Sequence, residues 1–366
     1  MPGTDGWLMR RLRHLDPILL ILVLVLLGIS LAVVASASGQ NPSRITGHLV
    51  NMGLALTLMV AVANVPPHLL SKIGLPLYAA GVVLLVGVAL FGEIRNGSRR
   101  WLDLGVLAFQ PSELLKLALP LMLAWYFQRN ETVRGARHYL IAGVLVLLPF
   151  VLILRQPDLG TAMMIGASGF YLLFFAGLPW KAMIGGGTLA AVSLPLVWNL
   201  LHDYQQRRVL TLIDPAADPL GAGYHIIQST IAIGSGGLFG KGWMAGTQSQ
   251  LDFIPERTTD FVFAVFGEEF GYVGAILLVA LYLAIVARGL SIAGRAPTQF
   301  GRLMAATLSL NFFTYVFVNV GMVSGILPVV GVPLPLMSYG GTALVTLLLG
   351  VGILMSVATH RQINKT

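Results

Sequence analysis

Long apolar runs separated by short polar segments occupy most of the chain, from Pro17 to about residue 358. A helix crosses the hydrocarbon core of a bilayer with roughly 17–25 residues of this kind. The pattern therefore predicts an all-α, polytopic membrane protein with about ten transmembrane helices. Their expected ranges are 17–35, 46–64, 74–92, 112–127, 138–154, 161–178, 180–200, 261–287, 301–323 and 339–358.

We predict a single transmembrane domain over residues 1–366. Its polar parts are a short head (1–16), one long loop (201–260) before the eighth helix and a tail (359–366). A connection of about sixty residues is far longer than usual and is commonly functional or disordered. Residues 220–234 form an amphipathic stretch that could lie along the membrane interface. The glycine-rich run 234–242 could wrap an anion with its backbone N–H groups, or it could simply form flexible turns.

Composition excludes an ordinary soluble protein, because 56% of residues are hydrophobic and only 10% are charged. The absence of cysteine excludes a disulfide framework. The net charge of +8 first serves membrane orientation, so we expect no nucleic-acid partner. Thirteen Lys and Arg residues lie on the side of the N-terminus, against five in the short loops of the other side. This asymmetry predicts that both termini are cytoplasmic and that the loop 201–260 lies on the outer face.

Asp260 lies where a polar loop runs into the eighth apolar run, within the sequence Pro255-Glu-Arg-Thr-Thr-Asp-Phe261. An ionisable group at the edge of a membrane helix is costly unless a partner or a cavity receives it, which makes it a functional candidate. The competing interpretation is that Thr259 or Asp260 only caps the helix by accepting a hydrogen bond from its first turn. At this position the two interpretations are about equally well supported.

Other charged residues at helix ends on the same predicted face are Arg100, Glu113, Lys116, Asp158 and Arg208. Each has a simple alternative explanation. Glu113 and Lys116 share a helix face and could merely neutralise each other, Asp158 could cap a helix, and Arg208 could anchor the chain at the interface. Together with Asp260, they suit an anionic, lipid-linked substrate, because cations hold phosphate and a carboxylate accepts a proton.

Several motifs, taken in order, resemble the SEDS family (shape, elongation, division and sporulation). They are Gly97-Ser-Arg-Arg-Trp-Leu-Asp-Leu-Gly105 with Gln110-Pro-Ser-Glu113 and Lys116, Gln156-Pro-Asp-Leu-Gly-Thr161, Pro255-Glu-Arg-Thr-Thr-Asp-Phe261 and Leu327-Pro-Val-Val-Gly-Val-Pro-Leu-Pro-Leu-Met-Ser-Tyr-Gly-Gly341. The resemblance covers nearly the whole chain. The short head, the Asp203–Arg208 segment and Gly223-Tyr-His-Ile-Ile-Gln-Ser229 are more similar to the elongation member of the family than to the division member.

The resemblance implies a peptidoglycan glycosyltransferase that polymerises lipid II on the periplasmic face of the bacterial inner membrane during elongation and rod-shape maintenance. It implies as partners a class B penicillin-binding transpeptidase, other membrane proteins of the elongation complex, the growing lipid-linked glycan and membrane lipids. The proposed catalytic carboxylate of the family matches Asp260, and its Glu and Lys in the fourth helix match Glu113 and Lys116. Many members have His where this chain has Thr258, so a role for that His cannot be transferred.

On this basis Asp260 is the predicted general base. Charge that develops on a pyrophosphate leaving group needs fixed cations. We expect these cations to be, in descending order, Arg208, Lys116, Arg100 and Lys241, with Glu113 and Asp158 lining the same substrate site. A Mg²⁺ or Mn²⁺ ion could share the task. No ligand cluster in the sequence identifies a metal site or another cofactor.

Two other functions compete with the enzyme. A flippase for lipid-linked cell-wall precursors would use the same basic cavity but would need no proton acceptor. A non-catalytic scaffold for wall-building enzymes would tolerate the loss of every cavity charge. The loss of Asp260 therefore distinguishes the enzyme from both.

Overall fold

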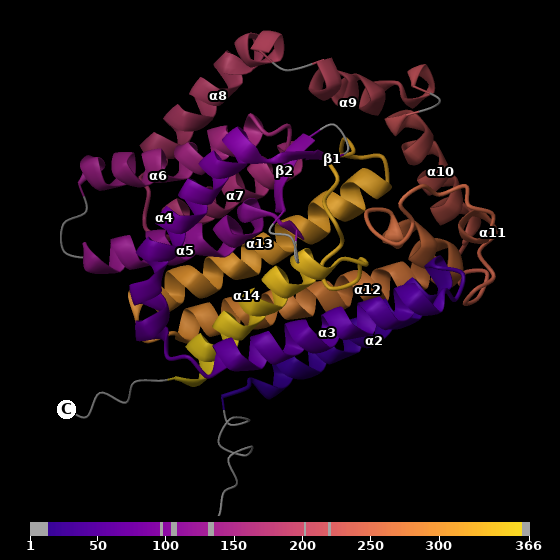
Figure 1. The fold of residues 1–366 in the computed structure, drawn as a ribbon, viewed down its shortest axis with the longest axis horizontal. Helices are drawn as coiled ribbons and strands as arrows, with labels where there is room; N and C mark the ends of the chain where they lie inside the picture. Colours follow the sequence, from indigo (N-terminus) through magenta and orange to yellow (C-terminus); the bar gives the residue numbers. More distant parts are fainter. Residues whose placement is uncertain are drawn as a thin grey trace, which may run out of the picture.

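The structure is a computed structural model, and it describes residues 14–95, 98–103, 108–130, 135–200, 203–218 and 221–360. The basic head up to residue 13 and the tail from residue 361, both assigned to the cytoplasm from the sequence, lie outside the described residues. Long helices make up nearly all of the described chain and pack side by side into one bundle (Figure 1).

A helix covers each of the ten predicted spans, which confirms the all-α, polytopic class. The helices are α2 (Pro17–Ala37), α3 (Pro42–Ala63), α4 (Pro67–Phe91), α5 (Pro111–Arg129), α6 (Ala136–Leu154), α7 (Leu159–Phe175), α8 (Trp180–Leu200), α12 (Val262–Arg295), α13 (Gln299–Val323) and α14 (Gly341–Thr359). Among the described residues, seven of the helices are long and apolar enough to cross a membrane by length and composition: α2, α3, α4, α6, α12, α13 and α14.

The long loop before α12 is folded and contains short helices. These are α9 (Asp203–Ile213), the 3₁₀ helix η1 (Pro215–Ala217), α10 (Ala222–Ser235) and α11 (Thr247–Gln250). The sequence did not predict the small antiparallel sheet between α4 and α5, with strand order β1 (Glu93–Arg95), β2 (Ser98–Asp103) and β3 (Ala108–Phe109). In Figure 1 the loop helices and this sheet lie toward the same end of the bundle.

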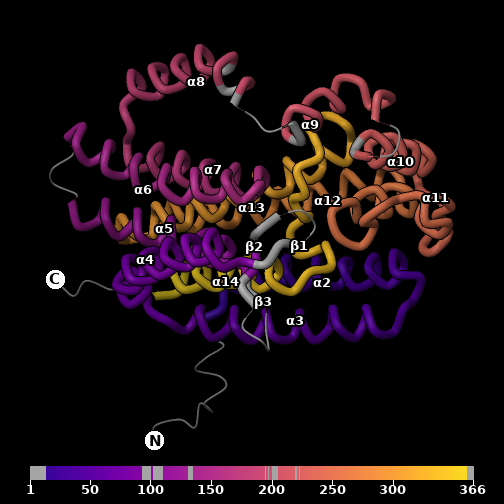
Figure 2. The backbone as a smooth tube through the Cα atoms, turned by 45° about the horizontal axis from the view of Figure 1, so that its top comes forward, coloured from indigo at the N-terminus to yellow at the C-terminus, as the bar shows by residue number. Residues whose placement is uncertain are grey.

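α13 forms the centre of the bundle and packs against α12, α7, α5 and α14 (Figure 2). Its side chains are largely apolar, and Asn319 is an exception that is fully buried. α8 is different, because it lies apart from the other helices in both views and its apolar side chains are exposed, for example Leu189 at 71%. Such a face is expected for a helix surrounded by lipid.

Local sequence sets many helix starts. α2, α3, α4 and α5 each begin with proline, whose missing N–H costs nothing in a first turn that has no partner for it. Asp16 caps α2 by accepting a hydrogen bond from the Leu19 N–H (2.9 Å), and Thr298 caps α13 through the Gly301 N–H (3.1 Å). Close helix contacts use glycine. Gly81 on α4, for example, lies directly against Leu115 on α5.

α12 is broken at Gly271, where φ is 68° and ψ is −166°. This backbone conformation is essentially restricted to glycine. The sequence predicted one continuous span over 261–287, because a single glycine in an apolar run does not by itself announce a break. The first segment of α12, residues 262–270, starts two residues after Asp260, and we call it the first half of α12.

The two ends of the described chain meet at one end of the bundle. The rings of His14 and His360 stack with centroids 4.2 Å apart, and Thr359 Oγ1 donates a hydrogen bond to the His14 carbonyl. Arg288, near the far end of α12, forms an ion pair with Asp16 at the same end. Asp260 lies at the opposite end of the bundle, because the Tyr339 N–H just before α14 binds the Thr258 carbonyl, whereas His360 follows the other end of that helix, about 28 Å away.

Candidate active site

The backbone around Asp260 is held in place by the segment that joins α13 to α14. Each of three consecutive carbonyl oxygens accepts a hydrogen bond, namely that of Thr258 from the Tyr339 N–H (2.7 Å), that of Thr259 from Ser338 Oγ (2.6 Å) and that of Asp260 from Asn319 Nδ2 (2.8 Å). Arg44 at the start of α3 adds a bond to Thr258 Oγ1 (2.9 Å). Three elements distant in sequence, α3, α13 and the segment before α14, therefore fix one carboxylate-bearing turn with four hydrogen bonds, which is the preorganisation that a catalytic group needs.

Asp260 is not a helix cap. The N-cap position of α12 is occupied by Phe261, and no side chain makes a capping hydrogen bond there. The capping interpretation is therefore wrong for both Thr259 and Asp260. The carboxylate lies over Gly331 instead, where an added Cβ would come within 3.5 Å of Asp260 Oδ2.

The electrostatic surroundings of Asp260 suit a proton acceptor. Burial raises the pKa of its carboxyl, the neighbouring Glu256 raises it further and Arg208 on α9 lowers it, with a resulting value of about 6. A general base works best when its pKa is near the operating pH. Burial is the largest of these three contributions.

We expect the polymerising activity that the resemblance implies to follow the ionised form of Asp260. As pH falls below about 6 the carboxyl is protonated, so kcat/KM should fall about tenfold per pH unit and should level off above that value. Glu256→Gln removes a like charge and should move this acid limb to lower pH. Arg208→Gln removes a cation and should move it to higher pH. A profile of kcat/KM between about pH 5 and pH 8 tests this, and a limb that neither variant moves would contradict the assignment.

Glu113 and Lys116 form the predicted ion pair on one face of α5, with 2.5 Å between Lys116 Nζ and Glu113 Oε1. The side chains are only 12% (Lys116) and 11% (Glu113) exposed, and Lys116 Nζ also lies 5.3 Å from the centroid of the Tyr315 ring. The other oxygen of Glu113 is buried without a hydrogen-bond partner among the described residues. This is a buried, incompletely satisfied charge pair rather than a surface salt bridge.

Asp158 caps α7, as the alternative interpretation held, but it also does more. Its Oδ1 accepts a hydrogen bond from the Thr161 N–H (3.1 Å), while Oδ2 accepts one from Gln110 Nε2 (3.2 Å) and lies 3.7 Å from Arg100 NH1. Arg100 also donates to the Pro157 carbonyl. Arg100 and Asp158, which were predicted only to line the same site, thus form an ion pair at the entrance to α7.

α13 and the loop that follows it connect these groups. Tyr315, which contacts Lys116, and Asn319, which binds the Asp260 carbonyl, are four residues apart and therefore about 6 Å apart along one face of the helix. The loop segment that covers Asp260 also lies against the start of α7, where the Val330 carbonyl would be 2.7 Å from a Cβ on Gly160. The cavity beside Lys116 and Tyr315 measures only about 50 Å³.

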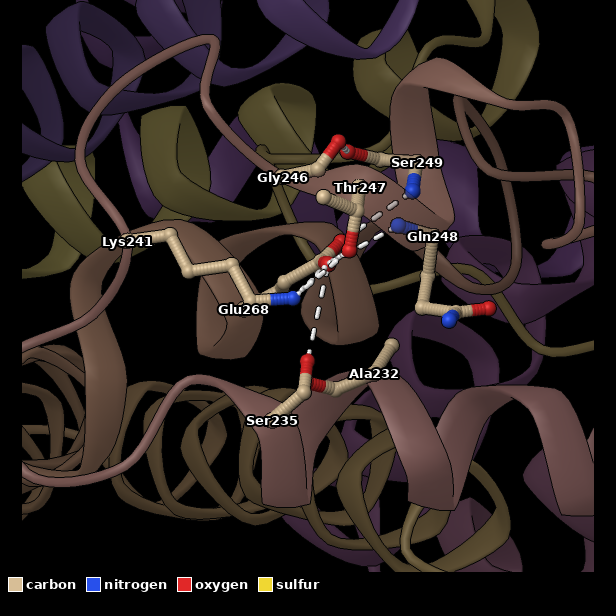
Figure 3. A network of polar contacts seen from close by, with 8 residues as sticks. All are labelled: Ala232, Ser235, Lys241, Gly246, Thr247, Gln248, Ser249 and Glu268. Carbon is tan, nitrogen blue, oxygen red and sulfur yellow. Dashed lines mark hydrogen bonds and ion pairs between the residues drawn. The ribbon is translucent and has the colours of Figure 1, made fainter.

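Lys241 belongs to a different cluster. Its Nζ lies 2.7 Å from Glu268 Oε1 and donates to Thr247 Oγ1 at 2.8 Å (Figure 3). The glycine-rich run around it also has a specific partner, because the Lys241 and Gly242 N–H groups donate to the Glu268 and Glu269 carbonyls of α12. These amides hold the broken helix and are not directed at an anion. A direct role of Lys241 at a pyrophosphate stays a prediction.

Sequence reasoning missed the residues that hold Asp260 in place. Asn319 carried a usable signal, since a lone Asn inside an apolar span needs a hydrogen-bond partner. Ser338 and Tyr339 stood in a recognised motif without an assigned role. Among the residues that the structure describes, no three His, Asp or Glu side chains are arranged to hold a metal ion. A Mg²⁺ or Mn²⁺ ion at this site also stays a prediction.

The fold and the arrangement of these motifs identify the class of protein. Residues 15–363 match the family described as cell cycle proteins of the FtsW, RodA and SpoVE type. The chain therefore belongs to this family, and the resemblance to SEDS proteins is confirmed.

Individual relatives cover nearly all of the chain. It is 52% identical over 350 residues to "Peptidoglycan glycosyltransferase MrdB" of Escherichia coli (strain K12), with 95% of each chain covered. Its fold matches a chain of a peptidoglycan synthase complex that coordinates polymerization and crosslinking, with a TM-score of 0.81, 37% identity and 94% and 97% of the two chains covered. It also matches the rod shape determining protein RodA of Thermus thermophilus, with a TM-score of 0.73, 31% identity and 95% and 98% covered. The expected similarity to the elongation member is thus confirmed.

Proposed function

We propose that this protein is a peptidoglycan glycosyltransferase that polymerises lipid II into β-1,4-linked glycan strands during cell elongation. The observation that carries the proposal is the partly buried Asp260 carboxylate at one end of the bundle, on a turn held by four hydrogen bonds from three elements and with its pKa raised to about 6. The E. coli relative, which is 52% identical over 95% of the chain, is named for this activity.

In the proposed reaction Asp260 accepts the proton of the acceptor 4-hydroxyl while the oxygen of that hydroxyl attacks the anomeric carbon of the growing chain. The bond from that carbon to the lipid pyrophosphate breaks, and inversion converts an α linkage into a β-1,4 bond. Positioned general-base catalysis contributes about 10²–10⁴-fold to the rate. The raised pKa makes Asp260 a stronger base than an ordinary aspartate while it stays ionised near neutral pH.

The departing pyrophosphate requires fixed positive charge. Arg208 acts on Asp260 electrostatically, and Lys116 and Arg100 belong to the clusters that α13 and its loop link to that carboxylate. In this proposal these cations bind the pyrophosphate, and Glu113 and Asp158 orient Lys116 and Arg100. A Mg²⁺ or Mn²⁺ ion bound to the pyrophosphate would add to the same neutralisation.

The proposed membrane location and orientation rest on the fold and on the distribution of charge. The protein is a multi-pass membrane protein, and we assign it to the bacterial inner membrane with both termini cytoplasmic and Asp260 on the periplasmic side, because the excess of Lys and Arg marks the cytoplasmic face. A structural relative belongs to a peptidoglycan synthase complex. We expect the partner of this chain to be a class B penicillin-binding transpeptidase.

Purified protein incubated with lipid II tests the proposal. We expect glycan polymer to appear in detergent without a membrane potential or a second compartment. A flippase would instead move the precursor across vesicle membranes without forming polymer. A scaffold would do neither. Absence of polymer from protein that is folded and supplied with its transpeptidase partner would refute the proposal.

A further inference from the structure

The break in α12 separates the short half that follows Asp260 from the rest of the helix. At such a break backbone groups lose their helical partners and must be satisfied by another segment. The loop at 237–242 supplies these bonds on both sides of Gly271. The Lys241 and Gly242 N–H groups donate to the Glu268 and Glu269 carbonyls (3.1 and 3.0 Å), and the Tyr272 and Val273 N–H groups donate to the Gly237 and Leu238 carbonyls (2.9 and 3.0 Å).

This contact tolerates no side chain at two positions of the loop, Gly236 and Gly240. A Cβ on Gly240 would lie 2.1 Å from the Glu269 carbonyl oxygen, and one on Gly236 would lie 2.2 Å from that of Gly267. The loop backbone therefore lies directly against the first half of α12. This close approach accounts for Gly236 and Gly240, while Gly237 and Gly242 have positive φ, a conformation that glycine adopts readily.

The Glu268 side chain fixes the loop from the other side. It is fully buried. Its two oxygens accept hydrogen bonds from the loop, and the carboxylate forms an ion pair with the loop residue Lys241 (Figure 3). The donors are Lys241 Nζ (2.7 Å), the Gln248 N–H (2.9 Å), the Ser249 N–H (3.1 Å) and Thr247 Oγ1 (3.2 Å), with Ser235 Oγ at 3.5 Å. A buried carboxylate with this many donors is a strong local anchor.

We infer that Glu268 is a positioning residue, which clamps the loop 235–249 onto residues 262–270 and thereby fixes the location of Asp260. The first half of α12 is about 13 Å long, so a tilt of about 5° at Gly271 would displace its start by about 1 Å. A displacement of that size is enough to cost about 10²-fold in rate. The inference rests on the proposed function of Asp260.

The neighbouring carboxylate provides a matched control. Glu269 is equally buried, but it has fewer partners: Ser36 Oγ donates to Oε1, the Met244 backbone N–H also interacts with the carboxyl, and Oε2 has no partner among the described residues. A glutamine at 269 keeps the acceptor for Ser36. A glutamine at 268 loses the charge that holds Lys241 and replaces one of the two acceptor oxygens with a donor. The two isosteric changes at adjacent positions thus differ in their effect on the clamp.

The experiment compares Glu268→Gln, the milder Thr247→Val and the control Glu269→Gln in the full-length protein. We expect Glu268→Gln to lower kcat by about 10²-fold with little change in KM, Thr247→Val to act in the same direction more weakly, and Glu269→Gln to behave as wild type. The acid limb of the pH profile should move to lower pH in Glu268→Gln, because a displaced Asp260 gains water. The charged groups that set this limb, Glu256 and Arg208, are unchanged in these variants.

A second readout follows the clamp itself. The chain has no cysteine, and Ser249 is 1% exposed, so Ser249→Cys reports opening of the loop through its reaction with a maleimide. We expect labelling to be at least about tenfold faster when combined with Glu268→Gln, but not with Glu269→Gln. The variants Lys241→Met and Glu268→Gln should be non-additive, since both disrupt the same contact.

The possible failures are distinguishable. If Asp260 is not the base, an Asp260→Asn protein will polymerise lipid II whatever residue 268 is. If the inference is wrong, Glu268→Gln will leave the acid limb near pH 6 and the labelling rate at Ser249→Cys unchanged. Additive effects of Lys241→Met and Glu268→Gln would likewise overturn it and would return Lys241 to the substrate's phosphate.

Discussion

Asp260→Asn should reduce lipid II polymerisation by about 10²–10⁴-fold, and Asp260→Ala should abolish it at the sensitivity of a gel assay. Asparagine has the size of aspartate but cannot accept the proton at neutral pH. The backbone bonds from Asn319, Ser338 and Tyr339 involve main-chain carbonyls, so they persist in both variants. The loss should therefore appear in kcat rather than in binding of the lipid-linked donor.

Stability should separate this effect from misfolding. Asp260 is not a cap, and burial of its charge is unfavourable, as its raised pKa indicates. Removing the charge should leave the melting temperature in detergent unchanged or slightly higher. Glu256→Gln is the matched control, because it removes an exposed carboxylate from the same turn and should retain activity with a shifted pH profile. An Asp260→Asn protein with full activity would exclude the general-base role.

The sequence predicted the helices because membrane helices are encoded by composition over long windows. A helix covers every predicted span, and prolines at residues 17, 42, 67 and 111 mark starts. The pairing of Glu113 with Lys116 was also predictable, since three residues on a helix fix their separation. Information that is local along the chain was thus sufficient for these features.

What the sequence did not reveal depends on contacts between distant segments. Lys241 and Glu268 are 27 residues apart and meet only because the loop folds back onto a broken helix. The capping interpretation of Asp260 failed for a related reason. The turn at residues 258–260 is set by bonds from the segment after α13, and α12 starts only beyond Phe261. Gly271 does not differ from other glycines of an apolar span until its neighbours are known, and Asn319 signals the need for a partner without showing that the partner is the turn of Asp260.

The second large effect is expected at the buried pair on α5. Lys116→Met leaves the Glu113 carboxylate, already lacking a partner for one oxygen, without its cation in a buried site. Removal of one member of a buried ion pair costs about 3–5 kcal/mol, which should lower the melting temperature by about 5 °C or more. Glu113→Gln should be less harmful, because Lys116 keeps its contact with the Tyr315 ring.

The double variant Glu113→Gln/Lys116→Met decides between the two interpretations of this pair. It leaves no unpaired charge, so the melting temperature should return close to that of wild type. If the pair only neutralises itself, polymerisation should return as well. We expect stability to return while kcat stays about 10²–10³-fold low, because Lys116 would no longer neutralise charge on the departing pyrophosphate. Wild-type polymerisation by the double variant would show that this pair is structural, and the phosphate-binding role would then fall to Arg208 and Arg100.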